Sequence, residues 1–104
     1  MIKRLGLTLF CVGLLPLSAQ AASFNCDNAT TPTEMAICDS PRLNALDEEV
    51  ADMYRDILSQ MTPREARRLR RDQRSWLIAR DSCGDDTRCL RSRYRERRAR
   101  LSEY

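Results

Sequence analysis

The amino-acid sequence predicts an all-α protein, a small disulfide-stapled bundle of one short helix and three longer helices. Apolar residues recur at intervals of three and four along the chain, and no alternation typical of strands occurs. Residues that favour helix starts precede these stretches. Four of the five cysteines lie beyond the N-terminal apolar segment, an even number that suits two disulfides.

Residues 1–21 have the order of a secretory signal peptide. Lys3 and Arg4 give a positive start, residues 5–17 form an apolar run, and residues 19–21 form the small-x-small pattern Ala-Gln-Ala. The run is too short for a membrane span, which needs roughly 20 residues to cross about 30 Å of hydrocarbon. We therefore expect export and cleavage.

The mature protein is expected to be a single helical domain, residues 22–104. Cleavage after Ala21 is the first expectation, and cleavage after Ala22 is the alternative. Neither Cys11 nor Cys26 follows the small-residue box that lipid attachment requires. The expected location is therefore periplasmic or secreted, with no stable membrane anchor.

Two capping boxes mark helix starts. Residues 31–34 (Thr-Pro-Thr-Glu) predict a short helix from Pro32 to about Cys38. Residues 62–65 (Thr-Pro-Arg-Glu) repeat the pattern and predict the start of a later helix. Ser40-Pro41 begins the helix that lies between them.

Along each longer helix, residues spaced three and four apart share one face, which we expect to point inward. The face after Ser40-Pro41 holds Leu43, Leu46, Val50, Met53 or Tyr54, Ile57 and Met61. The face after Thr62-Pro63 holds Ala66, Leu69, Gln73, Trp76, Arg80 and Cys83. Gly84 is expected to stop that helix, and Asp85 or Asp86 to cap the last one. The last face holds Leu90, Tyr94, Arg97, Leu101 and Tyr104. Short links imply an antiparallel order.

Four cysteines allow three pairings. Cys26 precedes the short helix that Cys38 ends, while Cys83 ends one helix and Cys89 falls in the first turn of the next. This plan favours Cys26–Cys38 with Cys83–Cys89, each bond contributing on the order of 2–3 kcal/mol. A zinc site is the alternative, but the spacing is not that of a CxxC knuckle and the chain has no histidine. We expect no metal and no cofactor.

Short motifs follow one another along nearly the whole mature chain. They are Cys26, Thr33-Glu34-Met35-Ala36-Ile37-Cys38, Leu43-Asn44-Ala45-Leu46-Asp47, Tyr54, Gln73-Arg74-Ser75-Trp76-Leu77, Arg80-Asp81, Cys83, Cys89-Leu90 and Tyr94. In order and spacing they resemble the LprI-type domain, a module named for a lysozyme inhibitor. The resemblance covers about residues 24–101 and implies a helical, disulfide-bonded envelope protein that inhibits lysozyme.

The composition argues against an enzyme. Without residues 1–21 the chain holds no lysine and no histidine, which removes the Schiff-base amine and the commonest general base. Carboxylates remain, but two of them hydrolyse a glycoside only across a cleft that holds the sugar. A thin helical bundle does not readily form such a cleft, so we expect no catalytic residue.

Two polar residues interrupt the otherwise apolar face of the helix that begins after Thr62. Gln73 and Arg80 lie on the same face as Trp76, and buried polar groups must be paired. We interpret Asp47, Gln73, Trp76 and Arg80 as a structural polar network, with Arg80 pairing Asp47. A polar pocket for a ligand is the alternative interpretation.

Charge divides the mature chain into two parts. Residues 22–61 carry about −6 and residues 62–104 about +7, so the mature net charge is about +1. The acidic residues Asp47, Glu48, Glu49, Asp52 and Asp56 are our candidates for binding a basic partner such as a lysozyme. Packing of an acidic helix beside a basic one is the simpler interpretation.

Arginines crowd the last two helices. They are Arg64, Arg67, Arg68, Arg70, Arg71 and Arg74, then Arg91, Arg93, Arg95, Arg97, Arg98 and Arg100. Export and the lack of interleaved aromatic residues argue against nucleic acid. We interpret these residues as solvated faces laced with ion pairs, and an anionic envelope surface such as lipopolysaccharide is the alternative partner.

The function predicted from the sequence is that of a periplasmic binding protein, a lysozyme inhibitor that occludes the substrate cleft without catalysis. The expected partner is a lysozyme or another cell-wall hydrolase. The alternative is an envelope accessory or assembly module that docks a partner protein or an anionic envelope surface. Protection of cell walls by purified components separates the two.

Overall fold

Four α-helices follow one another in residues 23–104, the part of the chain that this computed structural model describes. They are α1 (Pro32–Asp39), α2 (Pro41–Ser59), α3 (Pro63–Asp81) and α4 (Thr87–Leu101). A 3-10 turn, η1 (Cys26–Asn28), precedes them and was not expected from the sequence. The expected signal peptide and its cleavage site lie outside the described residues. The prediction of an all-α fold is confirmed.

The helix starts lie where the capping residues predict them. Thr31 and Glu34 form a complete capping box at α1, and Thr62 and Glu65 form another at α3. The hydroxyl of Ser40 accepts a hydrogen bond at 3.2 Å from the backbone N–H of Leu43, the third residue of α2. These caps act within a single turn, which is why the sequence alone reveals them.

The turn between α3 and α4 is set by Gly84 and Asp86. Gly84 has a φ of +58°, in the left-handed region that glycine adopts most readily. Its carbonyl accepts a hydrogen bond from the Thr33 hydroxyl at 2.8 Å, which ties this turn to α1. Asp86, rather than Asp85, caps α4. α3 ends at Asp81, two residues before the expected end at Cys83.

Two disulfides link neighbouring segments of the chain. Cys26–Cys38 joins η1 to α1 with a Cα–Cα distance of 5.8 Å. Cys83–Cys89 closes the turn between α3 and α4 with a Cα–Cα distance of 5.6 Å. Both distances lie in the usual range for a disulfide. The predicted pairing is confirmed.

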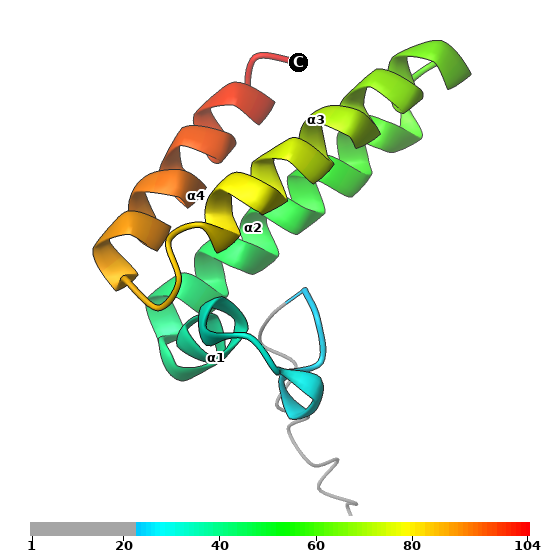
Figure 1. Cartoon of the computed structure of the whole chain (residues 1–104). Helices are drawn as coiled ribbons and strands as arrows, with labels where there is room; N and C mark the ends of the chain where they lie inside the picture. The colour runs from blue at the N-terminus through cyan, green and yellow to red at the C-terminus, as the bar shows by residue number, and fades with distance from the viewer. Residues whose placement is uncertain (1–22) are drawn as a thin grey trace, which may run out of the picture.

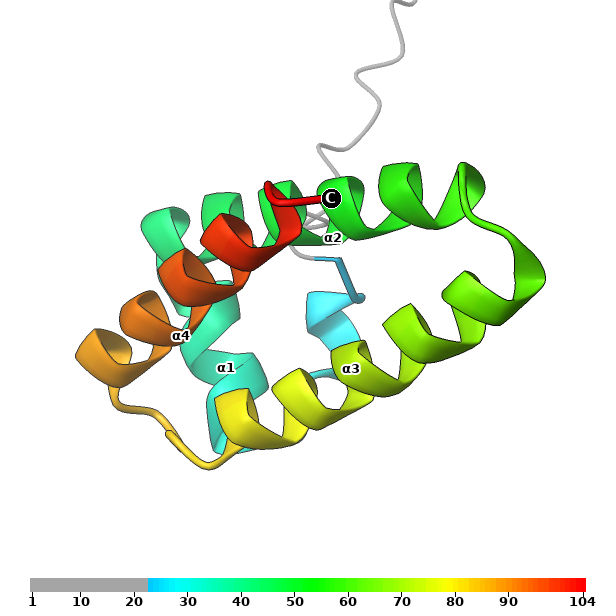
Figure 2. The same ribbon diagram turned by 90° about the horizontal axis from the view of Figure 1, so that it is seen from above.

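The three longer helices alternate in direction, as the short links predict (Figure 1). α4 nevertheless packs most extensively on α2, its neighbour but one in the sequence, while α1 also packs on α2. Figure 2 shows α1 lying between the helices at the end where α3 meets α4. The hairpin formed by α2 and α3 extends beyond the C-terminal end of α4 (Figure 1).

The buried core lies where α1, α2 and α4 meet, and α3 adds Leu69 to it. Its members are Ile37, Leu43, Leu46, Val50, Leu69, Leu90, Tyr94 and Leu101. Ile57 near the end of α2 and Met61 just after it are only partly buried, because the tip of the hairpin extends beyond α4. Tyr104, expected on the inner face, follows the end of α4 and is 61% exposed.

Candidate functional site

A buried polar cluster forms around Asp47 on α2. Its Oδ1 accepts a hydrogen bond from the Tyr94 hydroxyl at 2.7 Å, and its Oδ2 accepts one from the Ser23 backbone N–H at 2.6 Å. Arg80 Nη1 lies 3.8 Å from the same Oδ1. Both oxygens of this buried carboxylate are therefore bonded, and its charge faces an arginine.

Arg80 on α3 completes this cluster. Its Nη1 donates to the Tyr94 hydroxyl at 3.3 Å, and its Nε and Nη2 both donate to Asp81 Oδ1 at 3.0 and 2.9 Å. Arg80 is only 8% exposed, whereas the Asp81 side chain is half exposed. The buried Arg80 guanidinium thus connects two carboxylates. It reaches Asp47 in the interior through the Tyr94 hydroxyl, and it bonds Asp81 at the surface directly.

Aromatic rings enclose the cluster. The rings of Trp76 and Tyr94 meet edge to face with centroids 5.1 Å apart, and the Arg80 guanidinium lies 6.0 Å from the centroid of the Trp76 ring. The Trp76 indole N–H donates to the Arg93 carbonyl at 3.2 Å. Burial, reinforced by the charge of Asp47, raises the pKa of the Tyr94 hydroxyl far above its usual value. Tyr94 therefore remains a hydrogen-bond donor.

The structure brings together three of the four residues of the expected polar network. Asp47, Trp76 and Arg80 converge, but Gln73 makes its hydrogen bond with Arg97 and not with these three. The residue that joins the three is Tyr94, which was placed by periodicity on the inner face of the last helix without a role in the network. A tyrosine at an inward position beside charged inward residues was the signal for this role, since a buried hydroxyl needs a partner.

Gln73 belongs to a second polar contact. Its Oε1 accepts a hydrogen bond from Arg97 Nε at 3.0 Å. Arg97 is 6% exposed, and its Nη2 has no hydrogen-bond partner among the described residues. Burial lowers the pKa of this guanidinium, while the nearby Asp72 carboxylate acts in the opposite direction. Helical periodicity placed Arg97 on the face of Leu90 and Tyr94, but it was interpreted together with the neighbouring arginines as solvated.

Arg97 lines a hollow of about 590 Å³ between α3 and α4. The other residues that line it are Asp72, Ser75, Trp76, Glu96, Arg100, Glu103 and Tyr104. The hollow has charges of both signs, so its electrostatics do not select one class of ligand.

Four of the five acidic residues expected to bind a partner are exposed. Glu48, Glu49, Asp52 and Asp56 occupy the outer side of α2, and we call these four the acidic surface. Asp47 is a correction to the expected set: it is 3% exposed because Tyr94 and Arg80 hold it in the interior. A partner that contacts this side of α2 does not reach Asp47.

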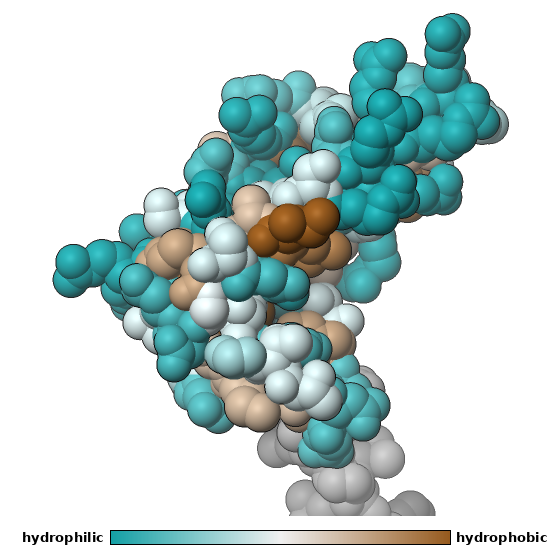
Figure 3. All heavy atoms as spheres, viewed as in Figure 1, coloured by the Kyte–Doolittle hydropathy of each residue, from teal (hydrophilic) through white to brown (hydrophobic). Residues whose placement is uncertain are grey.

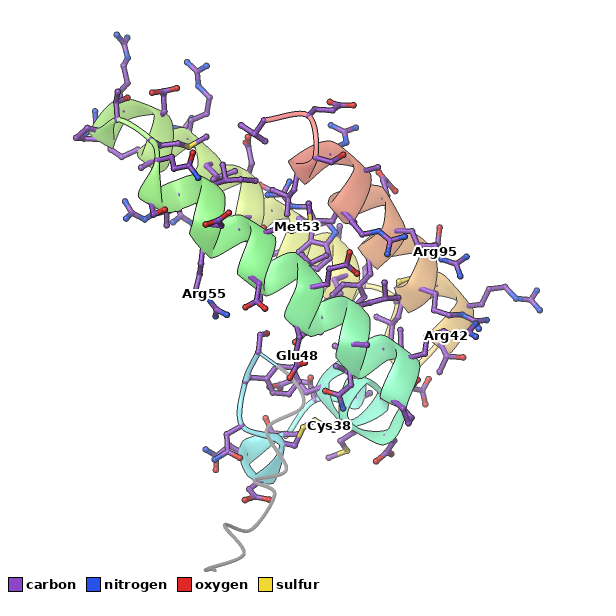
Figure 4. All side chains as sticks on the ribbon, turned by 180° about the vertical axis from the view of Figure 1, so that it is seen from behind. Cys38, Arg42, Glu48, Met53, Arg55 and Arg95 are labelled. Atoms are coloured by element: carbon purple, nitrogen blue, oxygen red, sulfur yellow. A yellow bond between two sulfur atoms is a disulfide. The ribbon has the colours of Figure 1, made fainter. Side chains whose placement is uncertain are left out.

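Two residues of the acidic surface are paired within the chain. Asp52 pairs with Arg55 one turn later on α2, and Glu49 accepts a hydrogen bond from Arg98 of α4 at 3.2 Å. Glu48 and Asp56 have no ion-pair partner among the described residues. Figure 4 shows the side chains of Glu48 and Arg55 extending from the same side of α2. This side carries more negative than positive charge.

Neither a metal site nor a membrane span is found within residues 23–104. No group of three or more histidine, cysteine or acidic side chains is placed to hold a metal ion there. The helices of this part of the chain are also too short or too polar to cross a membrane.

Comparison with known proteins gives one match. The model of a protein family described as lysozyme inhibitor LprI matches residues 26–103. Searches of curated proteins and of solved structures give no match. The matched range includes both disulfides, all four helices and the Asp47 cluster.

Proposed function

Since the chain belongs to the LprI lysozyme inhibitor family, we propose that it is a periplasmic or secreted protein that binds a lysozyme and blocks its substrate cleft without catalysis. The observation that carries the proposal is the acidic surface on the outer side of α2. Many lysozymes are basic, and complementary charge accelerates encounter and favours the correct partner. The two disulfides support an oxidising compartment outside the cytoplasm.

The acidic surface lies on a helix whose opposite side forms the core. Leu43, Leu46 and Val50 hold the inner side of α2 against its neighbours. The outer side chains therefore stand on a backbone that is already ordered, which reduces the entropy lost on binding. In this proposal the acidic surface contacts the basic rim of the cleft, and the helical body covers the path of the saccharide.

The interior cluster has a structural role in this proposal. Asp47 and Arg80 are buried, and their hydrogen bonds are made within the chain. They hold α2, α3 and α4 in register and thereby keep the acidic surface in place. The alternative of a ligand pocket gains no support at Asp47, because both of its oxygens are already bonded.

The test is a cell-wall turbidity assay with the oxidised mature protein and lysozymes of several classes. The variant Glu48→Lys/Asp52→Lys/Asp56→Lys should weaken inhibition at least about tenfold and reduce its dependence on salt. The matched control is Asp27→Lys/Asp39→Lys/Asp85→Lys, which changes the net charge equally at exposed residues of other segments. The control should inhibit nearly as well as the wild type.

Two results would contradict the proposal in different ways. Unchanged inhibition by the variant of the acidic surface would show that another surface binds the enzyme. Absence of inhibition for every lysozyme class, with the oxidised protein folded by circular dichroism, would contradict the inhibitory function. Inhibition that disappears on reduction would show that the disulfide-stapled fold is required.

A further inference from the structure

A row of arginines follows the outer side of α3. Arg64, Arg67, Arg71 and Arg74 are spaced three or four residues apart, so they lie on one side of the helix. All four are exposed, and we call them the arginine row. Arg68 and Arg70 are also exposed and flank the row.

The arginine row has no ionic partner among the described residues. The ion pairs there involve only Arg55, Arg80, Arg93 and Arg98. The expectation of a face laced with ion pairs therefore does not hold for the arginine row. Two of the acids on this helix have other partners, since Glu65 bonds the Thr62 cap and Asp81 bonds Arg80.

Like charges three and four residues apart destabilise a helix. Each member of the arginine row has another member at such a distance, so the row repels itself while the protein is free. An external anion that bridges these guanidinium groups would relieve that repulsion. Arginine suits phosphate in particular, because its planar group donates two parallel hydrogen bonds to phosphate oxygens.

The row continues into an exposed apolar residue. Ile78 follows Arg74 by four residues on the same side of α3 and is 73% exposed. Figure 3 shows a brown patch at the C-terminal part of α3, bordered by white and teal, while the side chains near the N-terminal end of α3 are teal. At a bilayer surface, an exposed aliphatic side chain next to basic residues enters the boundary between headgroups and acyl chains, as the apolar side chains of interfacial helices do.

We propose that the arginine row and Ile78 bind the surface of a bilayer that contains anionic phospholipids. The arginines contact the headgroup phosphates, and Ile78 enters the boundary with the acyl chains. The acidic surface of α2 belongs to the opposite side of the α2–α3 hairpin, which Figure 4 shows from behind. A molecule bound in this way turns its acidic surface away from the lipid. The inference goes beyond lysozyme binding and does not depend on it.

The experiment measures sedimentation of the oxidised mature protein with vesicles of phosphatidylcholine alone, or with about one third phosphatidylglycerol. We expect binding only to the anionic vesicles, and its loss between about 0.05 M and about 0.5 M salt. The variant Arg67→Gln/Arg71→Gln/Arg74→Gln should lower the partition coefficient roughly a hundredfold, since each arginine near such a surface contributes about 1 kcal/mol. Ile78→Ser should lower it roughly fivefold.

The matched control is Arg42→Gln/Arg88→Gln/Arg95→Gln. These three arginines are exposed, have no ion pair in the described chain, and lie on α2 and α4. Figure 4 shows Arg42 and Arg95 on the view from behind. Both triple variants have the same net charge, so a difference between them reports position. The control should keep most of the binding.

Three outcomes would overturn the proposal. The first is that the wild type fails to sediment with anionic vesicles at low salt. The second is that both triple variants lose binding equally, which would make net charge the cause. Alternatively, the protein binds a soluble polyanion such as heparin but not the vesicles, which would assign the row to a different partner. Circular dichroism of each variant ensures that a loss of binding is not a loss of fold.

Discussion

Tyr94 donates its hydroxyl hydrogen to Asp47 across 2.7 Å and joins α4 to α2 inside the protein. The two residues are 47 positions apart in the sequence. Arg80 of α3 donates to the same hydroxyl, so one tyrosine connects all three long helices. The stability of this contact depends on a charge balance that single substitutions can disturb.

Arg80→Met is expected to destabilise the protein by about 3 kcal/mol or more, because it leaves Asp47 as a buried charge without a cation. Urea unfolding of the oxidised protein measures the free energy of unfolding. The double variant Arg80→Met/Asp47→Leu should recover a large part of the loss. If Arg80→Met kept its stability but abolished lysozyme inhibition, the cluster would be a binding site and not a structural one.

Tyr94→Phe is expected to lower the free energy of unfolding by about 1–3 kcal/mol, because Asp47 and Arg80 each lose a hydrogen-bond partner. The same variant tests the raised pKa of this tyrosine. The hydroxyl of Tyr94 should stay protonated at pH values where an ordinary tyrosine, with a pKa of about 10, ionises. The rise in absorbance near 295 nm should therefore be the same in the folded variant and wild type.

The raised pKa of Tyr94 also sets a direction for stability against pH. A hydroxyl whose pKa is higher in the folded than in the unfolded protein stabilises the fold fully below about pH 10. That contribution declines as the pH rises above this value. Wild type should lose stability there more steeply than Tyr94→Phe; parallel curves would contradict the assignment.

The capping box at α3 predicts a pH dependence at the acidic end. Hydrogen bonds from the side chain and backbone of Thr62 lower the pKa of Glu65. A carboxyl whose pKa is lowered by folding stabilises the protein above its unfolded pKa of about 4.3, and this contribution is lost as the pH falls through the folded value. Glu65→Gln should therefore be less stable than wild type at neutral pH but not at strongly acidic pH.

Urea unfolding at both pH values checks this prediction. Glu48→Gln is the control, since Glu48 is exposed on α2, outside any capping box and without an ion pair in the described chain. A difference between Glu65→Gln and wild type that persists at acidic pH would show that the carboxylate charge is not its cause.

Removal of either disulfide should cost about 2–3 kcal/mol, because each bond restricts the unfolded chain. The variants Cys26→Ser/Cys38→Ser and Cys83→Ser/Cys89→Ser separate the two contributions. Peptide mapping without reductant should recover these two pairs from the wild type. Either variant remaining as stable as the wild type would contradict the role of that bond.

The sequence predicted the helices more accurately than the details of their packing. Thr31, Ser40 and Thr62 revealed three helix starts, because a cap bonds to backbone groups only two or three residues away. The end of α3 was predicted two residues too late, and the turn η1 was not predicted at all. Their geometry depends on the closed disulfides and on a bond from Thr33 of α1 to the turn at Gly84.

The candidate site was predicted in part. Arg80 and Asp47 were expected to pair, but Tyr94 was not expected between them, and Gln73 bonds Arg97 instead. Helical periodicity places a residue on a face, but it does not say which atoms of the facing helix lie opposite. Asp47 shows the consequence. It was grouped with the exposed acids of α2, although it is buried and its neighbour Glu48 is exposed.

The sequence by itself determined the helical class, the helix starts and the cysteine pairing, because these follow from interactions between residues close along the chain. Only the tertiary structure decided which charges are buried and which face the solvent. That choice depends on the direct packing of α4 against α2, two helices that α3 separates in the sequence. This packing brings Tyr94 to Asp47. The same packing leaves the arginine row of α3 on the outside, without ionic partners in the described chain.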